Sequence, residues 1–221
     1  MYAELPLVLP AVTGTEPTAE RVSTPINVKL VLAVIGAAAV VIIGYGLVTN
    51  KEPLGVDVVA PTVNGEALPD YSDDPLSDGA VGSLIPTAVG TDFIGESVVI
   101  EPDGRPKILL FLAHWCSHCR AEVPVVQQWI DGGGLPAGVD LVAVATSIDR
   151  GRDNYPPDRW LEEENWSSPT LADTNNEVGK SFGLRGFPYW VFVDAEGRVV
   201  GRWGGELPIA QLDVVAGTLS S

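Results

Sequence analysis

The sequence predicts an α/β sandwich with a mixed central sheet, preceded by one transmembrane helix. First, residues 30–48 form an apolar run without a charge. Second, from residue 81 onward, apolar runs of strand length alternate with stretches of helical character, which is the pattern of a sheet covered by helices. Third, the last two strand-like runs flank a short turn and are expected to form a hairpin, which makes the sheet mixed.

The apolar run is long enough to cross a bilayer. A spanning helix needs about 20 apolar residues, whereas the core of a cleaved signal peptide has only about 7–15. We therefore expect residues 28–48 to be an uncleaved signal anchor, with a cleaved signal peptide as the alternative. No cysteine directly follows the run, which argues against a lipoprotein anchor. Arg21 and Lys29 precede the run and Lys51 follows it, so the positive-inside rule favours a cytoplasmic N-terminus.

Composition divides the rest of the chain. Residues 1–27 are expected to be a cytoplasmic tail, and residues 49–80, rich in Pro, Asp and Gly, a flexible acidic linker to a domain at 81–221. The net charge is −16, and nearly all of the acidic excess follows the apolar run. Nucleic acid is therefore excluded as a partner, because its binding needs basic patches.

We expect the domain to start with two strands that pair with each other, followed by a buried strand. Segments 87–93 and 97–101 are expected to form a hairpin. The run KILLFLA at 107–113 is continuously apolar, as in a strand that is buried on both faces. Further along the chain we expect helix 117–131, strand 139–146, helix 156–165, a short strand within 168–173, helix 174–183, strands 188–194 and 198–203, and helix 208–219.

Local residues mark the ends of these elements. Gly132–Gly134 ends the first helix. Thr174 is the expected N-cap of the helix at 174–183. Ala195–Gly197 supplies the turn of the last hairpin.

Both cysteines lie in one motif, Cys116-Ser117-His118-Cys119, at the junction of a buried strand and a helix. At the helix start, free backbone N–H groups and the helix dipole stabilise a thiolate, which makes Cys116 the expected nucleophile. Cys119 lies one helical turn further, close enough to attack a mixed disulfide at Cys116. The pair is thus a candidate redox-active disulfide, although zinc sites also use this spacing.

The segment FLAHWCSHCRAEVP (111–124) resembles the active-site segment of the thioredoxin superfamily, specifically its membrane-anchored TlpA/ResA-like branch. GLRGFPYWVFVDAEGRVV (183–200) resembles the cis-proline strand and hairpin of that family. The resemblance covers residues 81–221. It implies a thioredoxin-like three-layer sandwich whose active-site helix is kinked at Pro124.

The implied function is thiol–disulfide oxidoreductase activity toward protein substrates, without a bound cofactor or metal. A separate redox partner recycles the two cysteines. The implied location is the membrane of a bacterial cell, with a single span and the catalytic domain outside the cytoplasm.

The resemblance also implies roles for individual residues. Pro188 is expected to follow a cis peptide bond, so that the backbone of Phe187 pairs with an extended substrate peptide. Trp115 is expected beside this substrate site. Glu122 is expected to accept a proton from Cys119 or to tune its pKa; the alternative is a solvent-facing helix glutamate. The position of thioredoxin's own buried acid is occupied by Leu110.

We expect different roles for the two histidines. His118 precedes Cys119 and is expected to stabilise the Cys116 thiolate, which makes the couple more oxidising. The TlpA/ResA-like branch consists mostly of reductases, so the direction of electron flow stays open. His114 is expected to be partly exposed, without a role.

Three other function classes compete with this interpretation. A copper or zinc metallochaperone would use the two cysteines, His114 and His118, but four ligands within six residues do not easily surround one ion. A peroxiredoxin-like peroxidase would need a Thr/Ser-rich loop around its cysteine, which the sequence lacks. The third alternative is a non-catalytic module with an inert disulfide.

Overall fold

The computed structural model describes residues 58–73 and 78–220. The expected cytoplasmic tail, the signal anchor at 28–48 and the first part of the expected linker lie outside these residues. Among the residues that are described, no helix has both the length and the apolar character that a membrane span requires.

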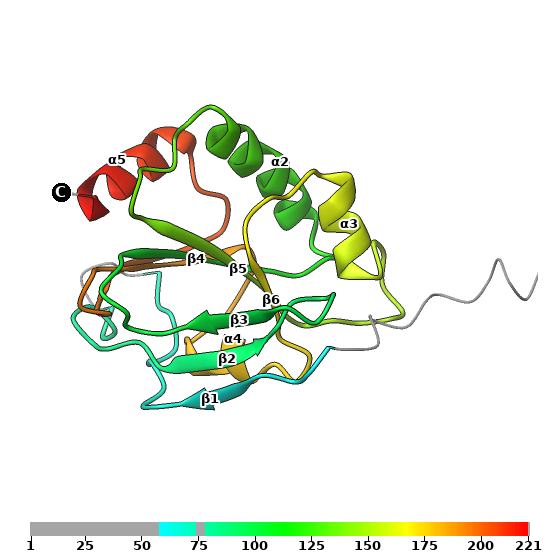
Figure 1. The fold of residues 1–221 in the computed structure, drawn as a ribbon, viewed down its shortest axis with the longest axis horizontal. Helices are drawn as coiled ribbons and strands as arrows, with labels where there is room; N and C mark the ends of the chain where they lie inside the picture. Colours follow the sequence, from blue (N-terminus) through cyan, green and yellow to red (C-terminus); the bar gives the residue numbers. More distant parts are fainter. Residues whose placement is uncertain (1–57, 74–77, 221) are drawn as a thin grey trace, which may run out of the picture. The chain divides into compact units, whose positions relative to one another are not determined.

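A five-stranded mixed sheet forms the centre of the domain (Figure 1). The strand order is β6-β5-β4-β7-β8, in which β4, β5 and β6 run parallel and β7 runs antiparallel to both β4 and β8. The mixed sheet expected from the sequence is therefore confirmed. Its strands are β4 (Lys107–Leu112), β5 (Asp140–Ala145), β6 (Thr170–Ala172), β7 (Tyr189–Val193) and β8 (Val199–Gly204).

Two further layers cover the sheet (Figure 1). One face carries three helices: α2 (Ser117–Asp131), α3 (Pro157–Glu163) and α5 (Ile209–Leu219). The other face carries α4 (Glu177–Ser181) and an antiparallel sheet of β1 (Thr62–Asn64), β2 (Thr87–Thr91) and β3 (Ser97–Ile100).

The position of β4 between two layers explains why its sequence is apolar after Lys107. All of its six residues are buried. Ile108, Leu110 and Leu112 belong to the core beneath the helices, whereas Leu109 and Phe111 belong to the core on the opposite face. Because successive side chains of a strand point to opposite faces, a strand between two layers is apolar at every position.

The expected domain boundary at residue 81 is wrong. Strand β1 pairs with β2, and the backbone N–H groups of Leu68 and Tyr71 donate to carbonyls of Ser181 and Gly183. The buried guanidinium of Arg202 forms an ion pair with Asp78. The described residues before 81 are thus part of the domain, because long-range contacts order a segment whose composition resembles a linker.

Helix α4 also begins later than expected. Its first helical residue is Glu177, and its N-cap is Asn176 in the left-handed conformation rather than Thr174. The buried carboxylate of Asp173 accepts hydrogen bonds from the N–H groups of Val178 and Gly179. A side chain that precedes the helix therefore satisfies the N–H groups that a cap residue would otherwise bind.

The topology gathers four chain segments at one edge of the central sheet. Strands β4 and β5 end there together, because Leu112 is paired with Ala145. Strand β7 begins there at Tyr189, which is paired with Gly204 at the end of β8. The two cysteines, the Phe187–Pro188 dipeptide and the β8–α5 connection therefore meet at this edge.

Candidate active site

Cys116 is the N-cap residue of α2. Its backbone is extended, its N–H donates to Ala113 O at 2.9 Å, and its carbonyl accepts from Arg120 N at 3.1 Å. Its thiol is partly exposed and lies 3.8 Å from the carbonyl oxygen of Phe187. The expected position at the helix start is thus the observed one, and a partner sulfur can reach this thiol.

Cys119 has the opposite environment. It is fully buried in the first turn of α2, and Ala113 N–H points at its sulfur at 3.5 Å. Burial raises the pKa of the Cys119 thiol far above its ordinary value, and the hydrogen bond from Ala113 offsets this only in part. A buried, protonated thiol does not react with bulky partners, so the two cysteines differ in accessibility.

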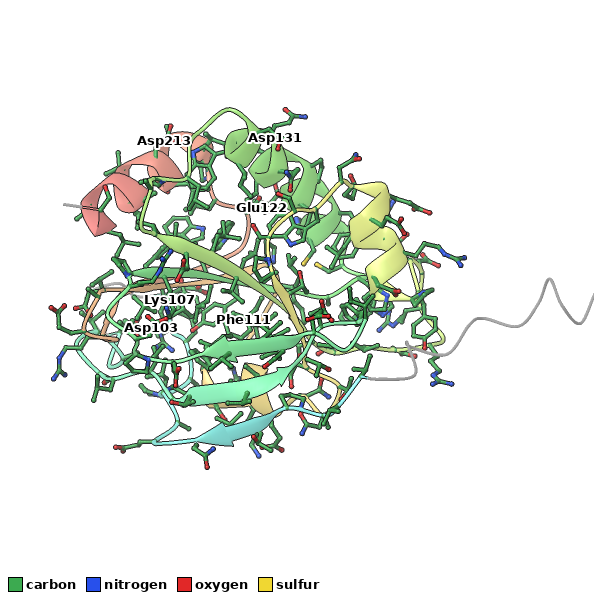
Figure 2. The ribbon with its side chains drawn as sticks, in the orientation of Figure 1. Asp103, Lys107, Phe111, Glu122, Asp131 and Asp213 are labelled. Atoms are coloured by element: carbon green, nitrogen blue, oxygen red, sulfur yellow. The ribbon has the colours of Figure 1, made fainter. Side chains whose placement is uncertain are left out.

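Glu122 is buried one turn after Cys119, between α2 and the central sheet (Figure 2). One carboxylate oxygen, Oε1, accepts a hydrogen bond from Leu207 N–H at 2.9 Å. Burial raises the pKa of Glu122 to about 7, against the lowering effect of this hydrogen bond and with a further rise from the charge of Glu206. The alternative of a solvent-facing helix glutamate is therefore wrong. A carboxyl with this pKa exchanges protons near neutral pH.

His118 is exposed, and its ring contacts an acid that the sequence analysis did not identify. Nδ1 lies 2.7 Å from Oε1 of Glu206, and since a carboxylate only accepts, Nδ1–H is the donor. Glu206 belongs to the connection between β8 and α5, 88 residues further along the chain.

Trp115 and Phe187 line the same edge. The Trp115 ring packs edge-on against Phe187 with ring centres 5.9 Å apart, and its Nε1–H donates to Ser147 O at 2.8 Å. The guanidinium of Arg152 lies 4.6 Å from the centre of the Trp115 ring. The peptide bond between Phe187 and Pro188 is cis. Of the three predicted substrate-binding residues, Phe187 thus contacts both the Cys116 thiol and the Trp115 ring, and Pro188 follows it directly.

His114 is buried rather than partly exposed. Its Nδ1 lies 2.7 Å from Asp153 O, its Nε2 accepts from Asp149 N–H at 3.2 Å, and its carbonyl accepts from Asn154 at 2.8 Å. The connection after β5 thus folds over the end of β4 and covers the imidazole. The apolar pattern of β4 alone does not show which connection packs over its end, and for this reason the predicted exposure of His114 was wrong.

Sequence reasoning missed Glu206, Leu207, Ser147 and Arg152 as neighbours of the dithiol. The available signal was topological: each follows a strand that ends at the edge where Cys116 lies. Across residues 58–73 and 78–220, no three or more His, Cys, Asp or Glu side chains are grouped as a metal ion would require.

The sequence profile of the thioredoxin-like domain family matches residues 96–218, more than half of the chain. The thiol-disulfide oxidoreductase ResA of Bacillus thuringiensis subsp. konkukian is 23% identical over 134 residues, which cover 60% of this chain and 75% of that protein. The thiol:disulfide interchange protein DsbE of Pseudomonas fluorescens biotype C is 27% identical over 114 residues, covering 50% of this chain and 59% of the relative.

A solved structure shows the same fold. StoA from Bacillus subtilis superposes with a TM-score of 0.51 at 22% identity, covering 62% of this chain and 98% of StoA. The family match, the ResA and DsbE relatives and the shared fold agree with the resemblance at residues 111–124 and 183–200, and the chain belongs to the thioredoxin-like family.

Proposed function

We propose that this protein is a membrane-anchored thiol–disulfide oxidoreductase that exchanges disulfides with protein substrates outside the cytoplasm. The observation that carries the proposal is the asymmetry of the two cysteines. Cys116 is accessible at a helix start, whereas Cys119 is buried one turn away. The names of the ResA and DsbE relatives support the same activity.

In the reducing direction, the Cys116 thiolate attacks one sulfur of a substrate disulfide. The substrate S–S bond breaks, a mixed disulfide to Cys116 forms, and the second substrate sulfur leaves as a thiolate. Cys119 then loses its proton and attacks the Cys116 sulfur, which releases the first substrate sulfur. The protein's dithiol gives up two electrons, which the substrate disulfide gains, and a separate redox partner restores the dithiol.

Glu122 serves the second step. Its carboxylate takes the proton of Cys119, one helical turn away, because a thiol with a raised pKa does not ionise unaided at neutral pH. At neutral pH, a carboxyl with a pKa of about 7 is present in both its protonated and its ionised form. Glu122 therefore also returns the proton to Cys119 when the reaction runs in the oxidising direction.

The substrate is held by the backbone beside Cys116. The Phe187 carbonyl lies next to the Cys116 thiol, and the peptide bond to Pro188 that follows is cis. An extended substrate segment pairs with this backbone, in the manner of a strand added to a sheet edge. Trp115 and Phe187 give the segment an apolar surface.

Mixed-disulfide trapping in the native cells tests the exchange. Cys119→Ser should leave Cys116 joined to substrates as reductant-sensitive adducts, because the resolving thiol is missing. Cys116→Ser is the matched control and should trap nothing. The proposal fails if Cys119→Ser yields no adducts, or if the two variants yield the same ones.

The membrane anchor has its own test. After extraction of membranes with alkaline carbonate, the chain should stay in the membrane pellet, because a spanning helix resists this treatment. Thiol labelling of intact cells with an impermeant maleimide should reach Cys116. Release into the supernatant contradicts the anchor, and labelling only after cell lysis contradicts the orientation.

A further inference from the structure

Three consecutive residues after β8 each contact a different part of the dithiol site. Gly205 N–H donates to Pro188 O at 2.8 Å. The Glu206 carboxylate binds His118 Nδ1 at 2.7 Å. Leu207 N–H donates to the Glu122 carboxylate at 2.9 Å. We call Gly205–Leu207 the bridging segment, because it joins the substrate-binding dipeptide to both titratable neighbours of the cysteines.

Local structure fixes this segment. Strand β8 ends at Gly204, and Gly205 turns the chain with a φ of +90°, in the left-handed region that glycine adopts most readily. The indole N–H of Trp203 donates to Glu206 O at 3.1 Å. Pro208 then starts α5 as its N-cap residue. Glu206 is therefore held from both sides with its carboxylate against His118.

The charge of Glu206 offsets the charge that a protonated His118 carries. An imidazolium alone stabilises a nearby thiolate and makes the couple more oxidising. Paired with a carboxylate, the imidazolium contributes no net charge, and a neutral imidazole leaves a net charge of −1. Removal of the carboxylate therefore makes the local charge more positive or leaves it unchanged, whichever form His118 takes.

We propose that Glu206 is a positioning residue that lowers the reduction potential of the Cys116–Cys119 couple by binding His118. The Ser117-His118 dipeptide alone would favour an oxidant, and the paired carboxylate moves the couple toward a reductant. This inference rests on the proposed function, because it concerns the same dithiol.

The test is the equilibrium of the full-length protein in detergent with reduced and oxidised glutathione. Glu206→Gln should shift the equilibrium constant toward the oxidant side by about three- to tenfold, which corresponds to about 14–30 mV for a two-electron couple. Glu206→Asp keeps the charge and should restore most of the wild-type value. The contacts of Gly205 and Leu207 use backbone N–H groups, so these substitutions leave them in place.

Two controls separate this role of Glu206 from the general effect of removing one negative charge from the protein. Glu196→Gln removes the same charge at the exposed β7–β8 turn, at the other end of those strands, and should leave the equilibrium unchanged. In a His118→Gln background, Glu206→Gln should change the logarithm of the equilibrium constant by at most half as much as it does in the wild-type background. The reason is that Glu206 then has no imidazole to bind.

The outcomes are distinguishable. The inference is overturned if Glu206→Gln leaves the constant unchanged, makes the couple more reducing, or has the same effect with and without His118. Failure of the wild-type cysteines to equilibrate with glutathione at all would instead contradict the proposed function.

Discussion

Replacement of Glu122 by glutamine should change how the stability of the reduced protein depends on pH. Burial raises the pKa of this carboxyl to about 7, from an ordinary value of 4.5. A carboxyl with a raised pKa in the fold costs stability when it ionises: the full cost is present above the folded-state pKa and disappears as the pH falls to the unfolded-state value. Each pKa unit is worth about 1.36 kcal/mol, so ionised Glu122 costs the fold about 3 kcal/mol.

The wild-type protein should therefore lose stability as the pH rises from about 5 to about 8. Over the same range, the free energy of unfolding of the glutamine variant should fall by about 2–3 kcal/mol less. The amide oxygen of glutamine still accepts the hydrogen bond from Leu207. Urea unfolding of the detergent-solubilised protein, with both cysteines kept reduced, measures the two free energies at each pH.

The matched control for this experiment is Glu163→Gln, which removes an exposed glutamate on α3. Its stability should follow the wild-type pH dependence within about 0.5 kcal/mol, because substitution of an exposed side chain usually changes the free energy of unfolding by no more than this. The difference in unfolding free energy between Glu122→Gln and wild type should grow from about pH 5 to about pH 8. If it stays the same or shrinks, then ionisation of a buried Glu122 does not set the pH dependence of stability.

Two further perturbations address the histidine and the early segment of the domain. His118→Pro removes the imidazole and leaves the Glu206 carboxylate, so the couple should become more reducing by about threefold or more in its equilibrium with glutathione; an unchanged constant would count against any role of His118 in setting the potential. Asp78→Ala leaves the buried guanidinium of Arg202 without its ion-pair partner and should cost about 3–5 kcal/mol in urea unfolding. Asp70→Ala breaks an exposed pair with Arg185 and should cost less than about 1 kcal/mol; equal costs would show that the Asp78 contact does not anchor this segment.

The elements of the central sheet were predictable because their signals are local. Strand β4 is apolar from Ile108 to Leu112 since it lies between two layers, and α2 begins directly after Cys116 as expected. The spacing of Glu122 three residues after Cys119 left both a side chain near the dithiol and a solvent-facing one open, and the structure buries it.

Features that depend on long-range contacts were not predictable. The described residues before 81, which are 58–73 and 78–80, have the composition of a linker, and they are ordered by hydrogen bonds such as that from Leu68 to Ser181. The partner of His118 was missed for the same reason, because Glu206 reaches it only when β8 ends beside the start of β7. His114 is covered by a connection whose path no strand pattern specifies.

A buried lysine at the opposite end of β4 shows the same limit. Lys107 opens β4 almost fully buried, and its ammonium group is paired with Asp103 at 2.6 Å (Figure 2). It is also paired with Asp140 at 3.4 Å. The lysine at the start of an apolar run resembles a surface residue in the sequence. Asp103 comes from the preceding turn, whereas Asp140 comes from β5 and reaches the lysine only in the assembled sheet.

The most direct test of dithiol exchange is a measurement of which cysteine reacts. The reduced native protein is treated briefly with iodoacetamide at about pH 7, where thiolates are the reactive species. It is then unfolded, labelled with N-ethylmaleimide and analysed by mass spectrometry. Carbamidomethyl should appear on Cys116 and maleimide on Cys119, because one thiol is accessible at the helix start and the other is buried. Carbamidomethyl on Cys119 to an equal or greater extent would contradict the assignment of Cys116 as the nucleophile.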